Sequence, residues 1–427
     1  MTDSKDSTGK TGGSPFNRTA QHDAKRSAIL SQAARLFNGR GSRSTTLLDI
    51  AQSLGLTKTS LYYYVKTKEE LIYQCYVAAL DHLNAGLDAI ESKQSSGLDR
   101  VTAVLHAHFI DWREAQLGHR NHTAALLEIA SLGDVHRADV EQRYTAMFLR
   151  IRQYIRDGIA EGSIRDCEST ATTLGLIGSM QWSFNWLRTV PIEQIDDIAR
   201  AACDLVTNGL SSGEQAYRFR DFSFPKLAAE NPQGFNREEQ NRLKQEAFHK
   251  TGTWFFNKKG FAGTSLDEIA ETLHVTKGAF YYHIKSKEDL LYSCYQRSLA
   301  ISETLRRDAD NLNRGIERLD YVCRGTFTIQ NSDDGPMIRY NTITALPIER
   351  RKKILALTDK GNDEFGGFMR DGITDGSVRS INVEVAQQLI SGAINASMDL
   401  PTWRNIEDVN QASIDFYDCL FSGLKPR

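Results

Sequence analysis

A long segment of this sequence occurs twice. Residues 41–76, "GSRSTTLLDIAQSLGLTKTSLYYYVKTKEELIYQCY", align without gaps on residues 260–295, "GFAGTSLDEIAETLHVTKGAFYYHIKSKEDLLYSCY", at an offset of 219 with 17 of 36 positions identical. A second pair, "IRDGIAEGSIR" at 155–165 and "MRDGITDGSVR" at 369–379, matches at an offset of 214. These offsets are far longer than the period of a solenoid, roughly 20–50 residues. The sequence therefore predicts two copies of one larger unit.

The elements expected within each copy are helices. Apolar residues recur at helical spacing, as at Ala201 and Leu205, and only 8 of the 427 residues are proline. This periodicity is typical of amphipathic helices, which proline would interrupt. We therefore expect an all-α fold.

The repeat and the composition divide the chain into six segments. The polar, Gly/Ser/Thr-rich start is typical of a disordered tail, and the Gly, Pro and Asn residues between the copies are typical of a linker. The expected segments are a tail at 1–20, a helix-turn-helix domain at 21–76, a helical domain at 77–211, a linker at 212–236, a second helix-turn-helix domain at 237–295 and a second helical domain at 296–427. The linker also contains four aromatic residues, so part of it is expected to dock on a domain: Tyr217, Phe219, Phe222 and Phe224.

Composition narrows the class of protein. The net charge is −2, so any nucleic-acid signature has to be local. The start of the chain has no apolar signal core, and no run of about 18 apolar residues occurs. None of the six cysteines forms a CxxC pair, which fits reduced thiols in a cytoplasmic protein: Cys75, Cys167, Cys203, Cys294, Cys323 and Cys419.

The first copy contains a helix-turn-helix pattern at about residues 46–65. Thr46 and Asp49 have the spacing of a capping box, which starts a helix. Gly55 is suited to the turn because glycine takes positive φ at low cost. Thr57 is expected to cap a second short helix with Leu61 facing inward.

The second copy repeats this pattern at about residues 265–284. Ser265 and Glu268 have capping-box spacing, and Thr276 matches Thr57. His274 stands where the first copy has Gly55, and histidine is a less favourable turn residue.

The outward face of the second motif helix is suited to DNA. Such a helix enters a major groove, where hydroxyl, lysine and aromatic side chains bond to bases or phosphates. In the first copy the face carries Lys58, Thr59, Ser60, Tyr62 and Tyr63. Lys66 and Lys68 follow where another helix begins, a natural phosphate clamp.

Local charge differs between the copies. Residues 25–73 hold eight Lys/Arg and three acidic residues, a net charge of +5. Residues 244–292 hold seven Lys/Arg and six acidic residues, a net charge of +1. We therefore expect the first copy to be the stronger DNA binder.

These segments resemble a known family. "TTLLDIAQSLGLTKTSLYYYVKTKEEL" and "TSLDEIAETLHVTKGAFYYHIKSKEDL" are similar to the DNA-binding domain of TetR/AcrR-type regulators, with the signature I-A-x-x-x-G-[LV]-[ST]-x-x-x-[LF]-Y-x-[HY]-[FVI]-x-x-K-x-x-L. The resemblance is strong over about 50 residues of each copy and weaker beyond. The second copy departs from the signature at His274, where the family usually has glycine.

The resemblance implies roles for the matching residues. The implied phosphate contacts are Thr45, Tyr63, Tyr64 and Lys68 in the first copy and Thr264, Tyr282, His283 and Lys287 in the second. The implied base-reading residues are Lys58, Thr59, Ser60 and Tyr62 in the first copy and Lys277, Gly278, Ala279 and Tyr281 in the second. Because Gly278 and Ala279 offer no polar side chain, the second copy is expected to read bases less well.

An effector site is expected in the first helical domain. Trp182, Phe184 and Trp186 are candidates to line it, although aromatic residues at this spacing also occur in cores. The resemblance implies a small-molecule effector, such as an acyl-CoA or other lipid-like thioester. The histidines nearby are expected to be hydrogen-bonded or solvated rather than metal ligands: His106, His108, His119 and His122. No cofactor or metal is expected.

Two other classes of protein remain as alternatives. An enzyme is disfavoured because the chain has no G-x-S-x-G, no H-E-x-x-H and no P-loop, and no G-x-G-x-x-G following a strand. The second alternative is a helical scaffold or co-regulator that pairs with another regulator and does not bind DNA.

The sequence also predicts how the regulator assembles. The resemblance implies homodimers joined through the last helices of the effector domains, and here both partners lie in one chain. We therefore expect an intramolecular pseudo-dimer acting as a ligand-released repressor, with a dimer of chains carrying four DNA-binding domains as the alternative.

Overall fold

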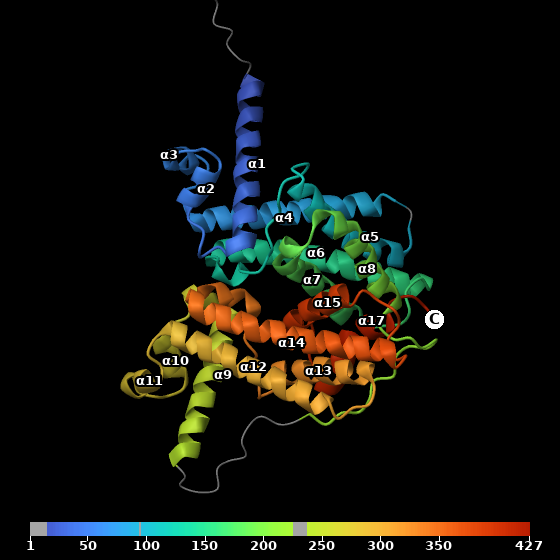
Figure 1. Cartoon of the computed structure of the whole chain (residues 1–427). Helices are drawn as coiled ribbons and strands as arrows, with labels where there is room; N and C mark the ends of the chain where they lie inside the picture. Colours follow the sequence, from blue (N-terminus) through green and yellow to red (C-terminus); the bar gives the residue numbers. More distant parts are fainter. Residues whose placement is uncertain (1–14, 94, 225–236) are drawn as a thin grey trace, which may run out of the picture.

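The computed structural model describes residues 15–93, 95–224 and 237–427, and within these ranges the secondary structure is helical (Figure 1). Half one contains α1 (Pro15–Arg40), α2 (Leu47–Ser53), α3 (Lys58–Tyr62), α4 (Lys68–Glu91), α5 (Gly97–Gln116), η1 (Ile129–Ser131), α6 (Asp134–Glu161), α7 (Ser169–Trp186), η2 (Leu187–Thr189), η3 (Ile192–Gln194) and α8 (Ile195–Asn208). Half two contains α9 (Arg237–Gly263), α10 (Leu266–Thr272), α11 (Lys277–His283), α12 (Lys287–Ala309), α13 (Gly315–Gln330), η4 (Tyr340–Ala345), α14 (Ile348–Thr374), α15 (Val383–Ala396), η5 (Ser397–Asp399), α16 (Leu400–Trp403) and α17 (Val409–Ser422). The expected all-α fold is confirmed.

Each half has a small head and a larger helical body. We call α1–α3 with the first turns of α4 head 1, and α9–α11 with the first turns of α12 head 2. In Figure 1 the helix pairs α2–α3 and α10–α11 project from the same side of the molecule. Of the tail expected at 1–20, residues 1–14 lie outside the described residues and residues 15–20 already belong to α1. Of the linker expected at 212–236, residues 225–236 lie outside them.

Local sequence explains the start of each short helix in head 1. The Thr46 hydroxyl accepts the Asp49 N–H and the Asp49 carboxylate accepts the Thr46 N–H, so the predicted capping box is present. Thr57 caps α3 by accepting the Ser60 N–H at 3.1 Å. Leu61 is buried on the inner side of α3, as expected.

Head 2 repeats this arrangement with two differences. Thr276 caps α11 through the Ala279 N–H, but the side chain of Ser265 makes no cap on α10, so the predicted second capping box is absent. His274 takes a φ of 54°, matching the 65° of Gly55 at the same turn. A non-glycine residue in this region carries backbone strain, which agrees with histidine being the less favourable choice.

The halves pack together through α7 and α15, where two glycines let the helices approach closely. A Cβ on Gly178 would lie 2.3 Å from the Cβ of Ala396, and one on Gly392 would lie 2.7 Å from the Cα of Ser179. The Ser179 hydroxyl donates across the junction to the Leu389 carbonyl at 2.7 Å. Only glycine at these two positions allows this distance between the helices.

The ends of α8 and α17 join the halves a second time. The Leu210 N–H donates to the Leu420 carbonyl at 3.0 Å, and the Leu424 N–H donates to the Val206 carbonyl at 2.9 Å. Leu424 lies 214 positions after Leu210, and Leu420 lies 214 positions after Val206, so the two bonds are equivalent under the offset of the second sequence repeat. The junction is therefore reciprocal.

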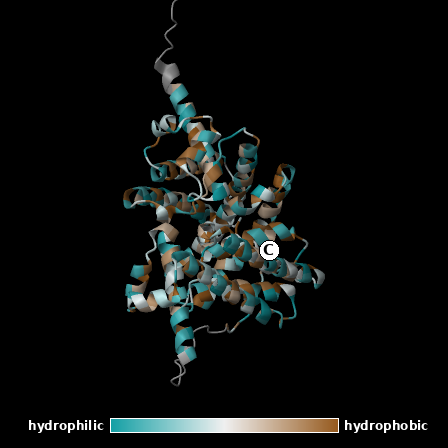
Figure 2. Ribbon diagram, turned by 60° about the vertical axis from the view of Figure 1, so that its left-hand side comes forward, coloured by the Kyte–Doolittle hydropathy of each residue, from teal (hydrophilic) through white to brown (hydrophobic). Residues whose placement is uncertain are grey.

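The buried apolar residues of the described part of the chain form two separate cores. One continuous apolar core runs from Ile29 in head 1 through both bodies to Leu424, whereas head 2 has a separate core around Phe256 and Phe280. In Figure 2 hydrophobic residues gather between the helices and hydrophilic ones predominate on the projecting part of α1. Within the described ranges, no helix has the length and apolar character needed to cross a membrane.

The described part of the linker docks on half two. Tyr217 lies 5.2 Å from Phe421 and Phe222 lies 5.2 Å from Tyr321, between ring centroids. Arg324 donates to the Arg220 carbonyl at 2.7 Å and pairs with Asp320 in a fully buried contact. Burial raises the pKa of Asp320 to about 6. The aromatic residues thus have the docking role expected from the sequence.

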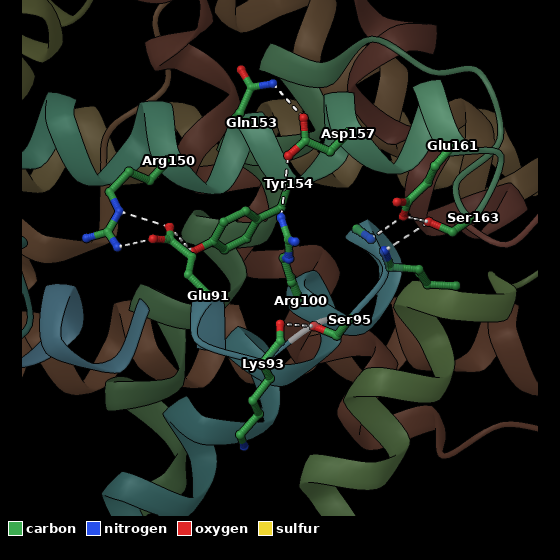
Figure 3. A network of polar contacts seen from close by, with 12 residues as sticks. Glu91, Lys93, Ser95, Arg100, Arg150, Gln153, Tyr154, Asp157, Glu161 and Ser163 are labelled. Carbon is green, nitrogen blue, oxygen red and sulfur yellow. Dashed lines mark hydrogen bonds and ion pairs between the residues drawn. The ribbon is translucent and has the colours of Figure 1, made fainter. Parts of the chain in front are cut away.

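A polar network ties α4, α5 and α6 together in half one (Figure 3). Glu91 at the end of α4 accepts from Arg150 at 2.9 Å and from the Tyr154 hydroxyl at 2.6 Å, both on α6. Arg100 on α5 pairs with Asp157 at 3.5 Å. These contacts fix the far end of α4, whose first turn belongs to head 1.

Candidate nucleic-acid interface

The outward face of α3 presents the side chains that the sequence singled out. Lys58, Thr59, Ser60 and Tyr62 are exposed. The Lys58 ammonium lies 5.6 Å from the centre of the Tyr62 ring, and within the described residues it has no acidic partner. Head 1 therefore offers a cation, two hydroxyls and an aromatic ring on one accessible face.

The matching face of α11 is exposed but partly neutralised. Lys277, Gly278, Ala279 and Tyr281 are accessible. The Lys277 ammonium pairs with Asp267 of α10 at 2.5 Å, and the Tyr281 hydroxyl donates to the same carboxylate at 3.3 Å. The bond to Asp267 raises the pKa of Lys277.

This pairing is a difference between the heads that the sequence reasoning missed. The residue of head 1 that aligns with Asp267 is Leu48, which is exposed and cannot bind Lys58. The aligned repeats contain the signal, because an acid in the first turn of one motif helix faces a lysine in the next.

The two threonines implied as phosphate contacts are buried. Thr45 donates its hydroxyl to the Gly41 carbonyl at 3.0 Å, and Thr264 donates to the Gly260 carbonyl at 2.7 Å. Their side chains are 1% and 3% exposed. These hydroxyls therefore brace the turn before each motif helix.

The tyrosines after each short helix are arranged differently in the two heads. Tyr63 and Tyr282 are each 75% exposed. Tyr64 stacks on His22 of α1 at 4.9 Å, while His283 lies 5.7 Å from Phe248 of α9. Tyr63 and Tyr282 are thus the more accessible members of each pair.

The lysine that begins each following helix donates to its own head. Lys68 lies 3.4 Å from the Arg43 carbonyl, and Lys287 lies 2.8 Å from the Thr264 carbonyl. Burial lowers the pKa of both lysines, and the nearby Arg43 lowers the pKa of each further.

The three aromatic residues suggested for an effector site do not share one cavity. Trp182 lies between the halves, donating to Gln388 at 2.9 Å and lying 5.0 Å from the ring of Tyr340. Phe184 lines a cavity of about 490 Å³ where head 1, α7 and η4 meet. Trp186 packs against the core of body one, 6.4 Å from Phe109.

The four histidines have separate surroundings. His108 bonds to Ser183 at 2.7 Å, and His119 bonds to Glu114 at 2.8 Å. His122 lines the cavity of about 180 Å³ beside Trp112, while His106 is exposed. Among the described residues, no group of three or more His, Cys, Asp or Glu is placed to hold a metal ion.

Comparisons with known proteins match the segments that contain both motifs. The family description "Bacterial regulatory proteins, tetR family" matches residues 29–75 and 252–294, which contain the two motifs. The description "Tetracyclin repressor-like, C-terminal domain" matches residues 95–210. The Transposon Tn10 TetC protein of Escherichia coli is 31% identical over 146 residues, which are 32% of this chain and 69% of that protein.

This chain belongs to the TetR family. It is a tandem member of a class of DNA-binding regulators, since the family's N-terminal domain is matched twice. The HTH-type transcriptional repressor KstR2 of Mycolicibacterium smegmatis is 27% identical over 199 residues, 46% of this chain and 95% of that repressor. The solved structure of the ketosteroid regulator KstR2 of Mycobacterium tuberculosis covers 41% of this chain and 89% of its own, with 25% identity and a TM-score of 0.36.

Proposed function

We propose that this TetR-family chain represses transcription as an intramolecular pseudo-dimer whose two heads bind one operator. The observation that carries the proposal is the reciprocal junction of α7 and α8 with α15 and α17, together with two heads on one side of the molecule. Reading neighbouring major grooves requires two heads about 34–36 Å apart, an arrangement that other family members reach by joining two chains.

The heads have unequal roles in this proposal. Head 1 reads bases through Lys58, Thr59, Ser60 and Tyr62, because that face is accessible and its lysine is not paired with an acid. Head 2 contributes Lys277, Gly278, Ala279 and Tyr281, with less discrimination. The proposed backbone contacts are Thr45, Tyr63, Tyr64, Lys68, Thr264, Tyr282, His283 and Lys287, with the buried threonines acting through their main chain.

We place the effector beside Phe184. The cavity of about 490 Å³ is within the usual size for small-molecule sites, roughly 300–1,000 Å³. It is lined by the end of α1, by Arg188 and by Arg351 and Thr344 of half two. An acyl-CoA or lipid-like thioester has an apolar chain for Phe184 and an anionic end for the arginines. Its entry would move head 1 away from half two, so DNA and effector would weaken each other's binding equally.

Light scattering and footprinting test the assembly. A mass near 48.0 kDa for the free chain supports the pseudo-dimer, and twice that mass supports a dimer of chains with four heads. The footprint is expected to be an imperfect palindrome with one strongly specified half-site. Equal sequence sensitivity in both half-sites would contradict the unequal heads.

Binding measurements test the assignments in head 1. Lys68→Ala should weaken binding to all sequences and lower the salt slope by about one. Thr59→Ala or Ser60→Ala should instead change sequence preference, by about 1–3 kcal/mol per good contact. Phe184→Ala should reduce the response to effector more than Trp182→Ala does. An unchanged preferred operator in both hydroxyl variants would refute the reading face.

A further inference from the structure

Two cations, one from each head, meet at one aromatic ring, and a third lies beside them. The guanidinium of Arg43, in the turn before α2, lies 4.1 Å from the centre of the Phe261 ring of head 2. The ammonium of Lys287 lies 4.7 Å from the same ring, and Lys68 reaches the Arg43 carbonyl. All four residues line a cleft of about 2040 Å³ that opens between the heads. We call Arg43, Lys68, Lys287 and Phe261 the seam.

The cations of the seam make no direct ion pair with a carboxylate in the described part of the chain. Within the described ranges, no carboxylate lies within 4.0 Å of Arg43, Lys68 or Lys287. The acids near the seam are Glu128 and Asp49, which raise the pKa of Lys68, and Glu288, which raises that of Lys287. Glu128 accepts a hydrogen bond from Ser42, and Asp49 accepts one from the Thr46 N–H, so neither carboxylate bonds directly to a seam cation. Arg43 lowers the pKa of both lysines, which shows that the like charges of the seam repel one another. An anion that lies among all three cations would relieve this repulsion.

The seam is made once in each chain. At the offset of 219, Arg43 aligns with Ala262 and Phe261 aligns with Ser42. The reverse contact, from an arginine of head 2 to a ring of head 1, is therefore impossible. The two copies carry different residues at both positions of this contact, so the seam forms only where both copies are joined in one chain.

We infer that the seam binds the DNA backbone at the centre of the operator, with Arg43 as a further phosphate contact shared between the heads. The inference rests on the proposed function. Arg43 is two positions before Thr45, and Lys68 and Lys287 begin the helices that follow the two reading helices. A duplex that engages both heads crosses the space between them, so its central phosphates meet this cluster. Arginine suits the contact because its planar guanidinium stacks on Phe261 and still donates to phosphate.

The inference is tested on the full chain with an operator selected from a random duplex library. Affinity is measured by fluorescence anisotropy over a range of salt. Arg43→Ala should weaken binding several-fold and lower the salt slope by about one, while Arg43→Lys should keep the slope. Arg200→Ala is the charge-matched control, since Arg200 is exposed on α8 and pairs with Asp197 away from the heads. Circular dichroism checks that each variant folds.

A second measurement identifies the anion. Methylphosphonate linkages, which carry no charge, replace the central phosphates of the same operator. The original chain should bind this duplex more weakly, and the difference between the two duplexes should be smaller for Arg43→Ala, in which Lys68 and Lys287 remain. If Arg43→Ala lowers the slope but central methylphosphonates have no effect, the seam holds a free counterion and the inference fails. If Lys68→Ala lowers the slope and Arg43→Ala does not, the inference fails while the proposed function stands. A chain that selects no duplex refutes the proposed function itself.

Discussion

Arg165 and Arg379 make the same contact in opposite directions across the junction of the halves. Arg165 donates to the Gly423 carbonyl at 2.6 Å and pairs with Asp418 at 2.7 Å. Arg379, 214 positions later, donates to the Gly209 carbonyl at 2.5 Å and pairs with Asp204 at 2.7 Å. Each arginine therefore holds the last helix of the other half.

This reciprocity predicts equal effects of the two substitutions. Arg165→Ala and Arg379→Ala should each lower the free energy of unfolding by about 2–3 kcal/mol, because each removes charge-assisted bonds and leaves carbonyl groups unsatisfied. Urea unfolding followed by circular dichroism measures the change. Arg200→Ala removes an exposed pair and should cost less than about 0.5 kcal/mol. A large effect of only one of the two substitutions would show that the two arginines do not stabilise the junction equally.

The glycines between α7 and α15 give a second prediction. Gly178→Ala and Gly392→Ala should each destabilise the chain by about 1–3 kcal/mol, since the added methyl group overlaps the facing helix. Gly367→Ala is the matched control, because a Cβ there meets nothing within 4 Å and alanine favours α14 by about 1 kcal/mol. Thermal unfolding should therefore shift in opposite directions. The same shift in all three variants would contradict close packing at this crossing.

Much of the architecture follows from the repeated sequence. Two copies of a helix-turn-helix pattern predict two heads, and the cap of Thr46 and the turn at Gly55 are local features that short-range chemistry determines. The capping box expected at Ser265 was wrong, and the Glu268 carboxylate that would complete it instead pairs with Lys259 at 2.9 Å. Local patterns specify where helices begin more reliably than which polar atoms pair there.

The features that the sequence predicts least well are contacts that depend on which helix faces pack against each other. Trp182 has the aromatic character expected of a pocket, yet it lies against half two because Gly178 brings α15 close. The ring of Phe261 and the guanidinium of Arg43 are distant in sequence, and only the packing of the two heads brings them together. Periodicity identifies a buried face of a helix but not its partner.

The ion pair between Asp267 and Lys277 predicts that head 2 binds DNA more weakly, because its lysine is already paired with an acid. Asp267→Leu, which places in head 2 the residue that aligns with it in head 1, should release the lysine and strengthen binding at the weaker half-site several-fold. The salt slope should rise by about one as the lysine gains a phosphate. Leu48→Asp is the reverse experiment and should weaken head 1 by pairing with Lys58. Fluorescence anisotropy with duplexes that carry one or both half-sites measures these changes. An unchanged affinity in Asp267→Leu would contradict the prediction and would mean that the difference between the heads comes from Gly278 and Ala279.

The last prediction concerns pH and His108 in body one. Burial beside Phe184 and Ser183 lowers the pKa of His108 to about 4, against about 6.5 in an unfolded chain. As pH falls below about 6.5 the unfolded chain binds a proton that the folded chain does not, so this group makes stability decrease until about pH 4. His108→Gln should remove this contribution, which we expect to be about 1–3 kcal/mol at the acidic end, while keeping a hydrogen bond to Ser183. Urea unfolding from pH 7 to pH 4 measures it, with His106→Gln as the control because His106 is exposed on the same helix. Parallel pH profiles for the original chain and His108→Gln would show that His108 is protonated in the folded protein as readily as in the unfolded one.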